Sequence, residues 1–196
     1  MICNYLTSAK KQFAYYKMLG EKTLAQLSDE ELHWQFNAES NSIAIIVNHV
    51  SGNMQSRWTD FLTSDGEKSW RNRDAEFEDS IASRAELLDR WNQGWQCLFQ
   101  ALDSINENNF ATEVYIRNTG HTVVEAINRQ LSHYAYHVGQ IVMLGKMLKG
   151  SAWQSLSIPK NQSEEYNEKK FSAAPQSEHF TQEFLDGTFY QKDGLR

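Results

Sequence analysis

The sequence predicts an all-α fold, in which a four-helix bundle is followed by a long polar C-terminal tail. Three observations predict it. Hydrophobic residues make up 40% of the 196 residues, which is enough to fill a core. Both prolines, Pro159 and Pro175, lie in the last fifth of the chain, so no proline interrupts a helix before that point. Four earlier segments repeat apolar residues with the 3.6-residue period of an amphipathic helix. We therefore expect a bundle over 1–150 and an extension over 151–196.

The first two long helices are expected over about 5–27 and 42–62. Between them, Ser28 and Glu31 have the spacing of a capping box, which predicts a short helical turn. The apolar positions that define the two helices are Phe13, Tyr16 and Leu24 in the first, and Ile43, Ile46, Val50, Met54 and Phe61 in the second.

The third and fourth helices are expected over about 80–105 and 122–148. The fourth begins at a second capping box, formed by Thr122 and Glu125. The connection over 106–121 includes VYIRNTG, for which we expect a short extended piece. The apolar side of the third helix is Ile81, Ala85, Leu88, Trp95, Leu98 and Leu102, and the inward stripe of the fourth is Val123, Ala126, Gln130, His133, His137, Ile141, Leu144 and Leu148.

Composition argues against several classes of partner. Lys plus Arg number 19 and Asp plus Glu number 25, which gives a net charge of −6 without any basic run. Such a chain is a poor candidate for binding nucleic acid or an anionic membrane. No apolar stretch approaches a bilayer span, and the N-terminus lacks a signal-peptide core, so we expect a cytoplasmic protein. Its two cysteines, Cys3 and Cys97, have no metal-binding spacing.

Two histidines of the fourth helix are candidate metal ligands. His133 and His137 are four residues apart, so both project from one face of the helix, roughly 6 Å apart along its axis. Ala126 and Leu144 lie within about 20° of His133 on a helical wheel, so both histidines should point inward. Two imidazoles at this spacing can bind one metal ion.

His49, on the second helix, is the third candidate. It lies on an edge of that helix that also carries polar residues, namely Ser42, Asn53, Ser56 and Asp60. Three neutral imidazoles from two helices would leave coordination positions open, as catalytic sites do. The alternative is that His133 and His137 are core histidines, hydrogen-bonded to Gln130, Tyr134 or backbone carbonyls. The remaining histidines, expected at the surface, are His33, His121 and His179.

A resemblance adds to these observations. The runs that carry it are NSIAIIVNHVSGNMQSRWTDFLTSDGEKSWRNRDAEFE, RQLSHYAYHVGQIVMLGKMLKG and WQSLSIPKNQSEEYN. Over about residues 5–167 they resemble the DinB/YfiT-like superfamily, and within it a bacterial branch described as a domain of unknown function. The resemblance implies a DinB-like four-helix bundle with one divalent-metal site of three histidines. On this chain those ligands are His49, His133 and His137.

The resemblance also implies an activity. Better-understood relatives are metal-dependent transferases of low-molecular-weight thiols such as bacillithiol or mycothiol. The implied metal would bind the thiol sulfur, lower its pKa and present a thiolate to an electrophilic small-molecule substrate. Zinc and nickel suit three imidazoles best, and manganese could also serve. No catalytic residue beyond the ligands is assigned.

Polar residues near the three histidines are candidates for supporting roles. Arg57 and Arg129 are expected to hold a carboxylate of the substrate or the thiol. Asn53 or Gln130 is expected to orient the ligand histidines. The charged loop over 63–79 is expected to cover the pocket. The further candidates are Asp60 on the second helix and, in the loop, Asp65, Trp70, Arg71 and Arg73.

Two other classes of function remain open. A metal-dependent hydrolase would use a metal-bound water and a nearby base, for which Asp60 and Glu125 are the candidates. In a non-catalytic module, the metal would only link the second helix to the fourth, or the protein would act as a stress-response binding partner.

We also expect a homodimer. Large side chains lie beyond the apolar stripes, and a symmetric dimer commonly buries such a surface, although the extension could cover it too. These large side chains are Tyr5, Tyr15, Trp91 and Phe99. The last residues of the extension are expected to be disordered.

Overall fold

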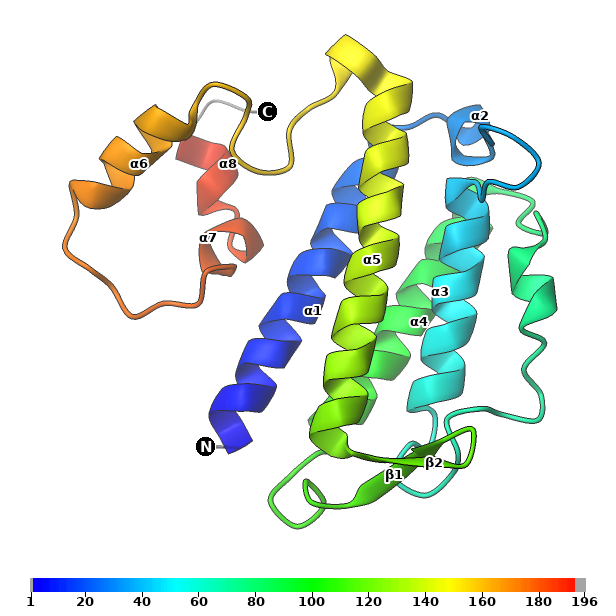
Figure 1. The fold of residues 1–196 in the computed structure, drawn as a ribbon. Helices are drawn as coiled ribbons and strands as arrows, with labels where there is room; N and C mark the ends of the chain where they lie inside the picture. The colour runs from blue at the N-terminus through cyan, green and yellow to red at the C-terminus, as the bar shows by residue number, and fades with distance from the viewer. Residues whose placement is uncertain (1, 193–196) are drawn as a thin grey trace.

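Four long helices lie side by side in the computed structural model, which describes residues 2–192 (Figure 1). They are α1 (Ile2–Leu24), α3 (Ile43–Trp58), α4 (Arg84–Asp103) and α5 (Val123–Lys149). α3 packs most extensively against α4, and α1 packs most extensively against α5. The chain is therefore mostly helical, as the sequence predicts.

The shorter elements connect the long helices or follow them. They are α2 (Asp29–Leu32), a 3₁₀-helix (Asp74–Phe77), the antiparallel strands β1 (Glu113–Ile116) and β2 (Thr119–Thr122), a 3₁₀ turn (Gly150–Ala152), α6 (Ser163–Phe171), α7 (Gln182–Leu185) and α8 (Thr188–Lys192).

Both predicted capping boxes are confirmed. The Ser28 hydroxyl accepts a hydrogen bond from the backbone N–H of Glu31 (3.2 Å), and the Glu31 carboxylate accepts one from the backbone N–H of Ser28 (2.7 Å). Thr122 and Glu125 pair in the same way, at 3.1 and 2.7 Å. Each box satisfies two N–H groups that the first helical turn leaves without an intrahelical partner.

Two predicted helix boundaries are corrected. The helix expected over 42–62 ends early, because Asp60 has a φ of 48°, which lies in the left-handed region and cannot continue a right-handed helix. The helix expected over 80–105 begins late, because the Ser83 hydroxyl caps it by accepting a hydrogen bond from the backbone N–H of Glu86 (3.2 Å).

The core contains a cluster of aromatic rings from three helices. Phe13 of α1, Trp95 of α4 and Tyr134 of α5 are fully buried, and their ring centroids lie 5.9 to 6.4 Å apart. The Tyr134 hydroxyl donates a hydrogen bond to Asn53 Oδ1 (3.1 Å) and accepts one from Trp58 Nε1 (3.1 Å). This buried tyrosine therefore joins α5 to α3 beside the candidate histidines.

A tight hairpin joins β1 to β2. Its turn residues, Arg117 and Asn118, have φ values of 55° and 57°, as a two-residue type I′ turn requires. The Asp65 carboxylate accepts hydrogen bonds from both of their backbone N–H groups, each at 2.8 Å. The extended piece predicted within 106–121 is confirmed, and the turn also anchors the loop over 63–79.

The segment expected as a polar tail holds three short helices. α7 lies against α1 (Figure 1). Tyr15 packs on Phe180 and Phe184, with centroid separations of 6.1 and 5.2 Å. Helices of four to nine residues are too short to show a clear amphipathic period, which is why the sequence does not reveal them. Residues 193–196, expected to be disordered, lie outside the described residues.

The side chains that suggested a dimer surface have partners within the chain. Trp91 was expected outside the core, but it is 1% exposed and packs on Trp95 at 5.4 Å. The ring partners of the other three are Phe110 for Tyr5, Phe180 and Phe184 for Tyr15, and Trp95 for Phe99. The homodimer therefore stays a prediction without the support of this surface.

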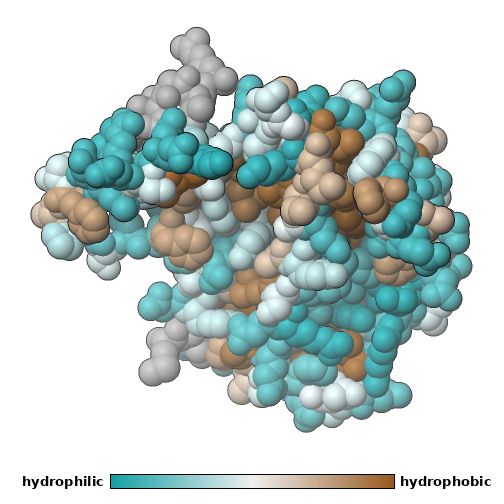
Figure 2. Space-filling model, turned by 45° about the horizontal axis from the view of Figure 1, so that its top comes forward, coloured by the Kyte–Doolittle hydropathy of each residue, from teal (hydrophilic) through white to brown (hydrophobic). Residues whose placement is uncertain are grey.

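The molecular surface is mostly hydrophilic on the face shown in Figure 2, where hydrophobic residues gather in separate patches. Within residues 2–192, no helix is both long enough and apolar enough to cross a membrane.

Candidate metal centre

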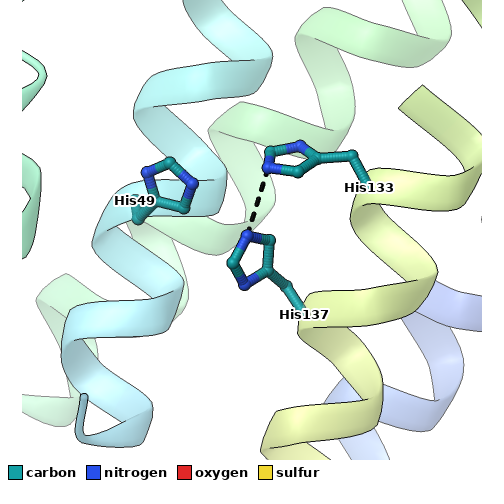
Figure 3. A group of neighbouring side chains, drawn as sticks. All are labelled: His49, His133 and His137. Carbon is teal, nitrogen blue, oxygen red and sulfur yellow. Dashed lines mark hydrogen bonds between the residues drawn. The ribbon is translucent and has the colours of Figure 1, made fainter. Parts of the chain in front are cut away.

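The three predicted histidines meet between α3 and α5, which run in opposite directions (Figures 1 and 3). One potential ligand atom from each of His49, His133 and His137 lies within 4.8 Å of the other two, so this group could hold a metal ion. Nε2 of His133 and Nε2 of His137 are 3.1 Å apart. Two nitrogens that share one zinc ion, each bound at ~2.0 Å, are separated by about 3 Å. The donor set and its spacing therefore fit a divalent ion.

His49 is held by a carboxylate from the loop over 63–79. Its Nδ1–H donates a hydrogen bond to Glu76 Oε2 (2.9 Å), and its ring stacks on Phe77 with a centroid separation of 4.6 Å. A carboxylate only accepts, so the proton of the neutral imidazole lies on Nδ1 and the lone pair on Nε2. Nε2 is therefore the free ligand atom of His49.

His137 is held in the same tautomer by an amide. Its Nδ1–H donates a hydrogen bond to Gln140 Oε1 (2.8 Å), and Gln140 Nε2 donates one to the Tyr136 hydroxyl (3.2 Å), which fixes the direction of the amide. The lone pair of His137 Nε2 then accepts the hydrogen bond from His133 Nε2–H. His133 Nδ1 is buried and has no hydrogen-bond partner among the described residues.

The environment keeps the rings of His133 and His137 neutral. Burial, together with the smaller effects of the neighbouring His137, His49, Arg57 and Arg71, lowers the pKa of His133 to about 3. Burial also lowers the pKa of His137. Burial alone would raise the pKa of Glu76, but hydrogen bonds from His49 and Arg71 bring it below its ordinary value. The site thus pairs the neutral imidazoles of His133 and His137, the form that binds metals, with the ionised carboxylate of Glu76.

These shifts predict a pH dependence of the metal-free protein. The folded-state pKa of His133 lies below the ordinary 6.5, so as pH falls through 6.5 the unfolded chain takes up a proton that the folded chain resists. The contribution of His133 to the free energy of unfolding is therefore fully present above pH 6.5 and decreases as the pH falls toward 3. Urea unfolding should show a lower midpoint at pH 5 than at pH 7.5. A His133→Gln variant with the same midpoint difference would contradict this origin.

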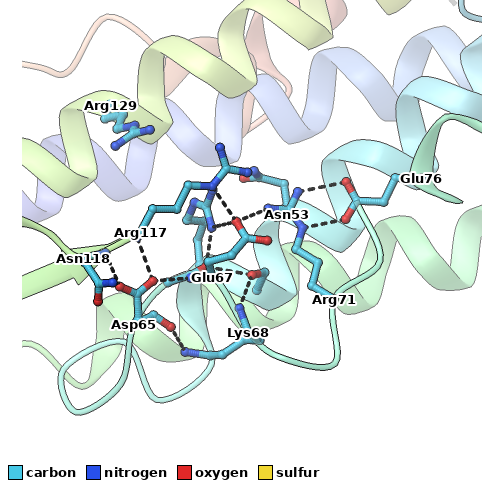
Figure 4. A network of polar contacts seen from close by, with 12 residues as sticks. Asn53, Asp65, Glu67, Lys68, Arg71, Glu76, Arg117, Asn118 and Arg129 are labelled. Carbon is cyan, nitrogen blue, oxygen red and sulfur yellow. Dashed lines mark hydrogen bonds and ion pairs between the residues drawn. The ribbon is translucent and has the colours of Figure 1, made fainter. Parts of the chain in front are cut away.

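A network of charged groups extends from the centre to the hairpin (Figure 4). Arg71 binds both oxygens of Glu76, through Nε (2.7 Å) and Nη2 (2.9 Å). The Glu67 carboxylate accepts hydrogen bonds from Arg57 and Arg71 (3.2 Å each) and from Arg117 (3.1 Å). The loop over 63–79, expected to be a cover, is thereby clamped to α3 and to the turn after β1.

The residues expected to hold substrate do not cluster around the three histidines. Arg57 is 7% exposed, and its Nη1 donates hydrogen bonds to the Gly66 carbonyl and to the Glu67 carboxylate. Arg129 is exposed and contacts Nε2 of His121 (3.1 Å). The two other candidates, Asp60 and Trp70, are also exposed. Within the described part of the chain, none of these four side chains forms a hydrogen bond to the three histidines.

The structure gives no hydrogen bond in support of the prediction that Asn53 or Gln130 orients a ligand histidine. Asn53 accepts its hydrogen bond from Tyr134, and Gln130 bonds to none of the three rings. Glu76 and Gln140 take that role instead. Gln140 follows His137 by three residues, so helical spacing could have found it. Glu76 lies 27 residues from His49 in the charged loop over 63–79, and no local pattern indicates it.

Gln130 carries an unusual buried amide. It is 3% exposed, and it lines a cavity of about 10 Å³ together with Arg57. Within residues 2–192, neither Gln130 Oε1 nor Arg57 Nε has a hydrogen-bond partner. A buried polar atom without a hydrogen bond costs roughly 1–3 kcal/mol. Gln130→Met, similar in volume, should therefore raise the free energy of unfolding by about 1 kcal/mol in urea titrations. A loss of stability would show that the amide has a stabilising partner.

One protein-family model matches most of the chain. Residues 1–162 match the model of the family described as "Protein of unknown function (DUF1572)". A search of the curated proteins finds no match, and neither does a search of the solved structures.

Proposed function

The chain belongs to the DUF1572 family, and we propose that it is a metal-dependent enzyme of the DinB-like type, built on a four-helix bundle. In this proposal His49, His133 and His137 bind one divalent ion. The enzyme transfers a low-molecular-weight thiol of the bacillithiol type to an electrophilic small molecule. The setting is a bacterial cytoplasm, without nucleic acid or membrane as a partner.

One observation carries the proposal. Three imidazoles from α3 and α5 converge, and among the described residues the group contains no fourth ligand. A structural zinc site uses four protein ligands, whereas a catalytic site uses three and leaves a position for water or substrate. A site made only to link two helices has no need of an open position.

The chain's own groups prepare this site. An ion held there supplies Lewis acidity, which lowers the pKa of a thiol or a water bound to it. Glu76 and Gln140 keep the Nε2 lone pairs of His49 and His137 available. Zinc or nickel is our first choice for three nitrogen ligands, and manganese is the third.

The hydrolase receives less support than the transferase. Of the two carboxylates considered as its base, Glu125 is engaged with Thr122 in the capping box, and Asp60 is exposed beyond the end of α3. Glu76, the carboxylate at the site, is bound by His49 and Arg71. A base must be free to take a proton from the attacking water.

The test is thiol dependence. Zinc-loaded protein is incubated with 1-chloro-2,4-dinitrobenzene, with and without bacillithiol, and the thioether is followed by absorbance. We expect formation above the uncatalysed rate only with the thiol, and none above that rate with His133→Ala. Equal rates for wild type and variant would refute the proposal. Hydrolysis of test esters without thiol would favour the hydrolase.

The dimer is tested separately by light scattering. The prediction is a mass of twice the 22.7-kDa chain at micromolar concentration. A mass near 22.7 kDa would show that the contacts between α1 and the C-terminal helices suffice to cover this side of the molecule.

A further inference from the structure

We infer that Glu76 is a positioning residue for His49, and that the loop carrying it sets how tightly the three histidines hold a metal ion. The inference deepens the proposed function and rests on it for the metal. Glu76 bonds the edge of the His49 ring at 2.9 Å, and its neighbour Phe77 stacks on the face of that ring at 4.6 Å. A single 3₁₀ turn thus restrains both the rotation and the tilt of one ligand.

The surface of α3 leaves space for this turn. A Cβ added at Gly52 would lie 2.6 Å from Glu76 Oε1 and 2.9 Å from its Cδ, so it would displace the carboxylate from its present position. Asn48 Nδ2 donates a hydrogen bond to the Glu76 backbone carbonyl (3.2 Å). Asn48, His49 and Gly52, all within two turns of one helix, therefore contact the same glutamate.

The Glu76 carboxylate is also held by an arginine of its own loop. Arg71 binds both of its oxygens, and Arg71 is itself bound by Glu67, which Arg117 of the hairpin turn contacts. The side chains of Glu76 and Arg71 are almost fully buried, at 8% and 2% exposed. A buried bidentate pair of this kind has little freedom to move.

The three candidate ligands differ in the hydrogen-bond partner of their Nδ1 atom. His49 has a charged acceptor, His137 has a neutral amide, and His133 Nδ1 has no partner among the described residues. A carboxylate beside an imidazole fixes its tautomer and strengthens the nitrogen that faces the metal. Loss of such a partner typically weakens metal binding about 10- to 100-fold. We expect the Glu76 effect in this range.

Two substitutions with matched controls test the inference. Glu76→Gln keeps an acceptor but removes the charge, and Gly52→Ala fills the space occupied by the carboxylate. Gly139→Ala, on α5 with nothing within 4 Å of an added Cβ, is the control for Gly52→Ala. Glu31→Gln is the control for Glu76→Gln, because Glu31 also makes an ion pair between two elements, with Lys149 (3.2 Å).

Zinc affinity is measured by competition with a chromophoric chelator. Glu76→Gln and Gly52→Ala should each weaken zinc binding about 10- to 100-fold, and the controls should change it less than twofold. Unchanged affinity in both test variants would overturn the inference. If the Glu76→Gln protein fails to fold, the zinc affinity of Gly52→Ala alone tests the inference, and an unchanged affinity overturns it.

The protonation site of His49 gives a second readout, which needs no metal. In ¹⁵N-histidine-labelled wild type, NMR should place the His49 proton on Nδ1, and in Gly52→Ala it should show a mixture of tautomers. A proton on Nε2 in wild type would overturn the inference. If wild type binds no zinc, the proposed function fails, and the tautomer in the two proteins still decides the role of Glu76.

Discussion

Replacing His133 with alanine is expected to lower bound metal from about one divalent ion per chain to a small fraction of that value. The variant leaves two imidazoles, His49 and His137, and metal affinity falls steeply when one of three protein ligands is lost. The measurement is elemental analysis of protein purified without a histidine tag, after dialysis against zinc at low concentration.

The matched control is His121→Ala. His121 lies on β2, where its Nε2 contacts Arg129 and it takes no part in the three-histidine group. Its loss should leave the metal content unchanged. Full metal content in the His133→Ala protein would contradict the site, and equal losses in both variants would point to nonspecific binding by surface histidines.

Removal of the metal is expected to lower the melting temperature by roughly 10 °C. Only the folded chain brings the ligands of α3 and α5 together, so binding free energy adds to folding stability. At an ion concentration ~1,000 times the Kd the gain is about 4 kcal/mol, and each kcal/mol shifts a domain of this size by roughly 2–4 °C. Calorimetry with and without EDTA measures the shift.

The same scan on the His133→Ala protein provides the control. EDTA should leave its melting temperature unchanged, because little metal remains to be removed. If EDTA strips the metal from the wild type and its melting temperature does not move, the ion contributes nothing to the folded state and the stabilising link between α3 and α5 is refuted.

Features set by short-range spacing could be predicted from the sequence. A capping box depends on two residues three apart, so Ser28 with Glu31 and Thr122 with Glu125 were evident. Apolar periodicity located the four long helices, although single residues such as Asp60 moved their ends. The position of His133 and His137 on one face follows from the helical repeat alone.

The candidate site was predictable only where it lies on helices. His49 could be selected because a helical wheel orders the side chains of α3, but no wheel describes the loop over 63–79. Glu76 reaches His49 through a 3₁₀ turn, and its charge is balanced by Arg71 of the same loop. In the sequence these residues resemble a solvated charged stretch.

The sequence by itself therefore determined the helical class, the two capping boxes and the three histidines, because each depends on residues a few positions apart. The tertiary structure decided which groups hold those histidines, what a side chain at Gly52 would displace, and why Trp91 lies inside. These contacts join segments that are distant along the chain, and their energies depend on burial and on the approach of two elements. Such quantities exist only once the helices have packed.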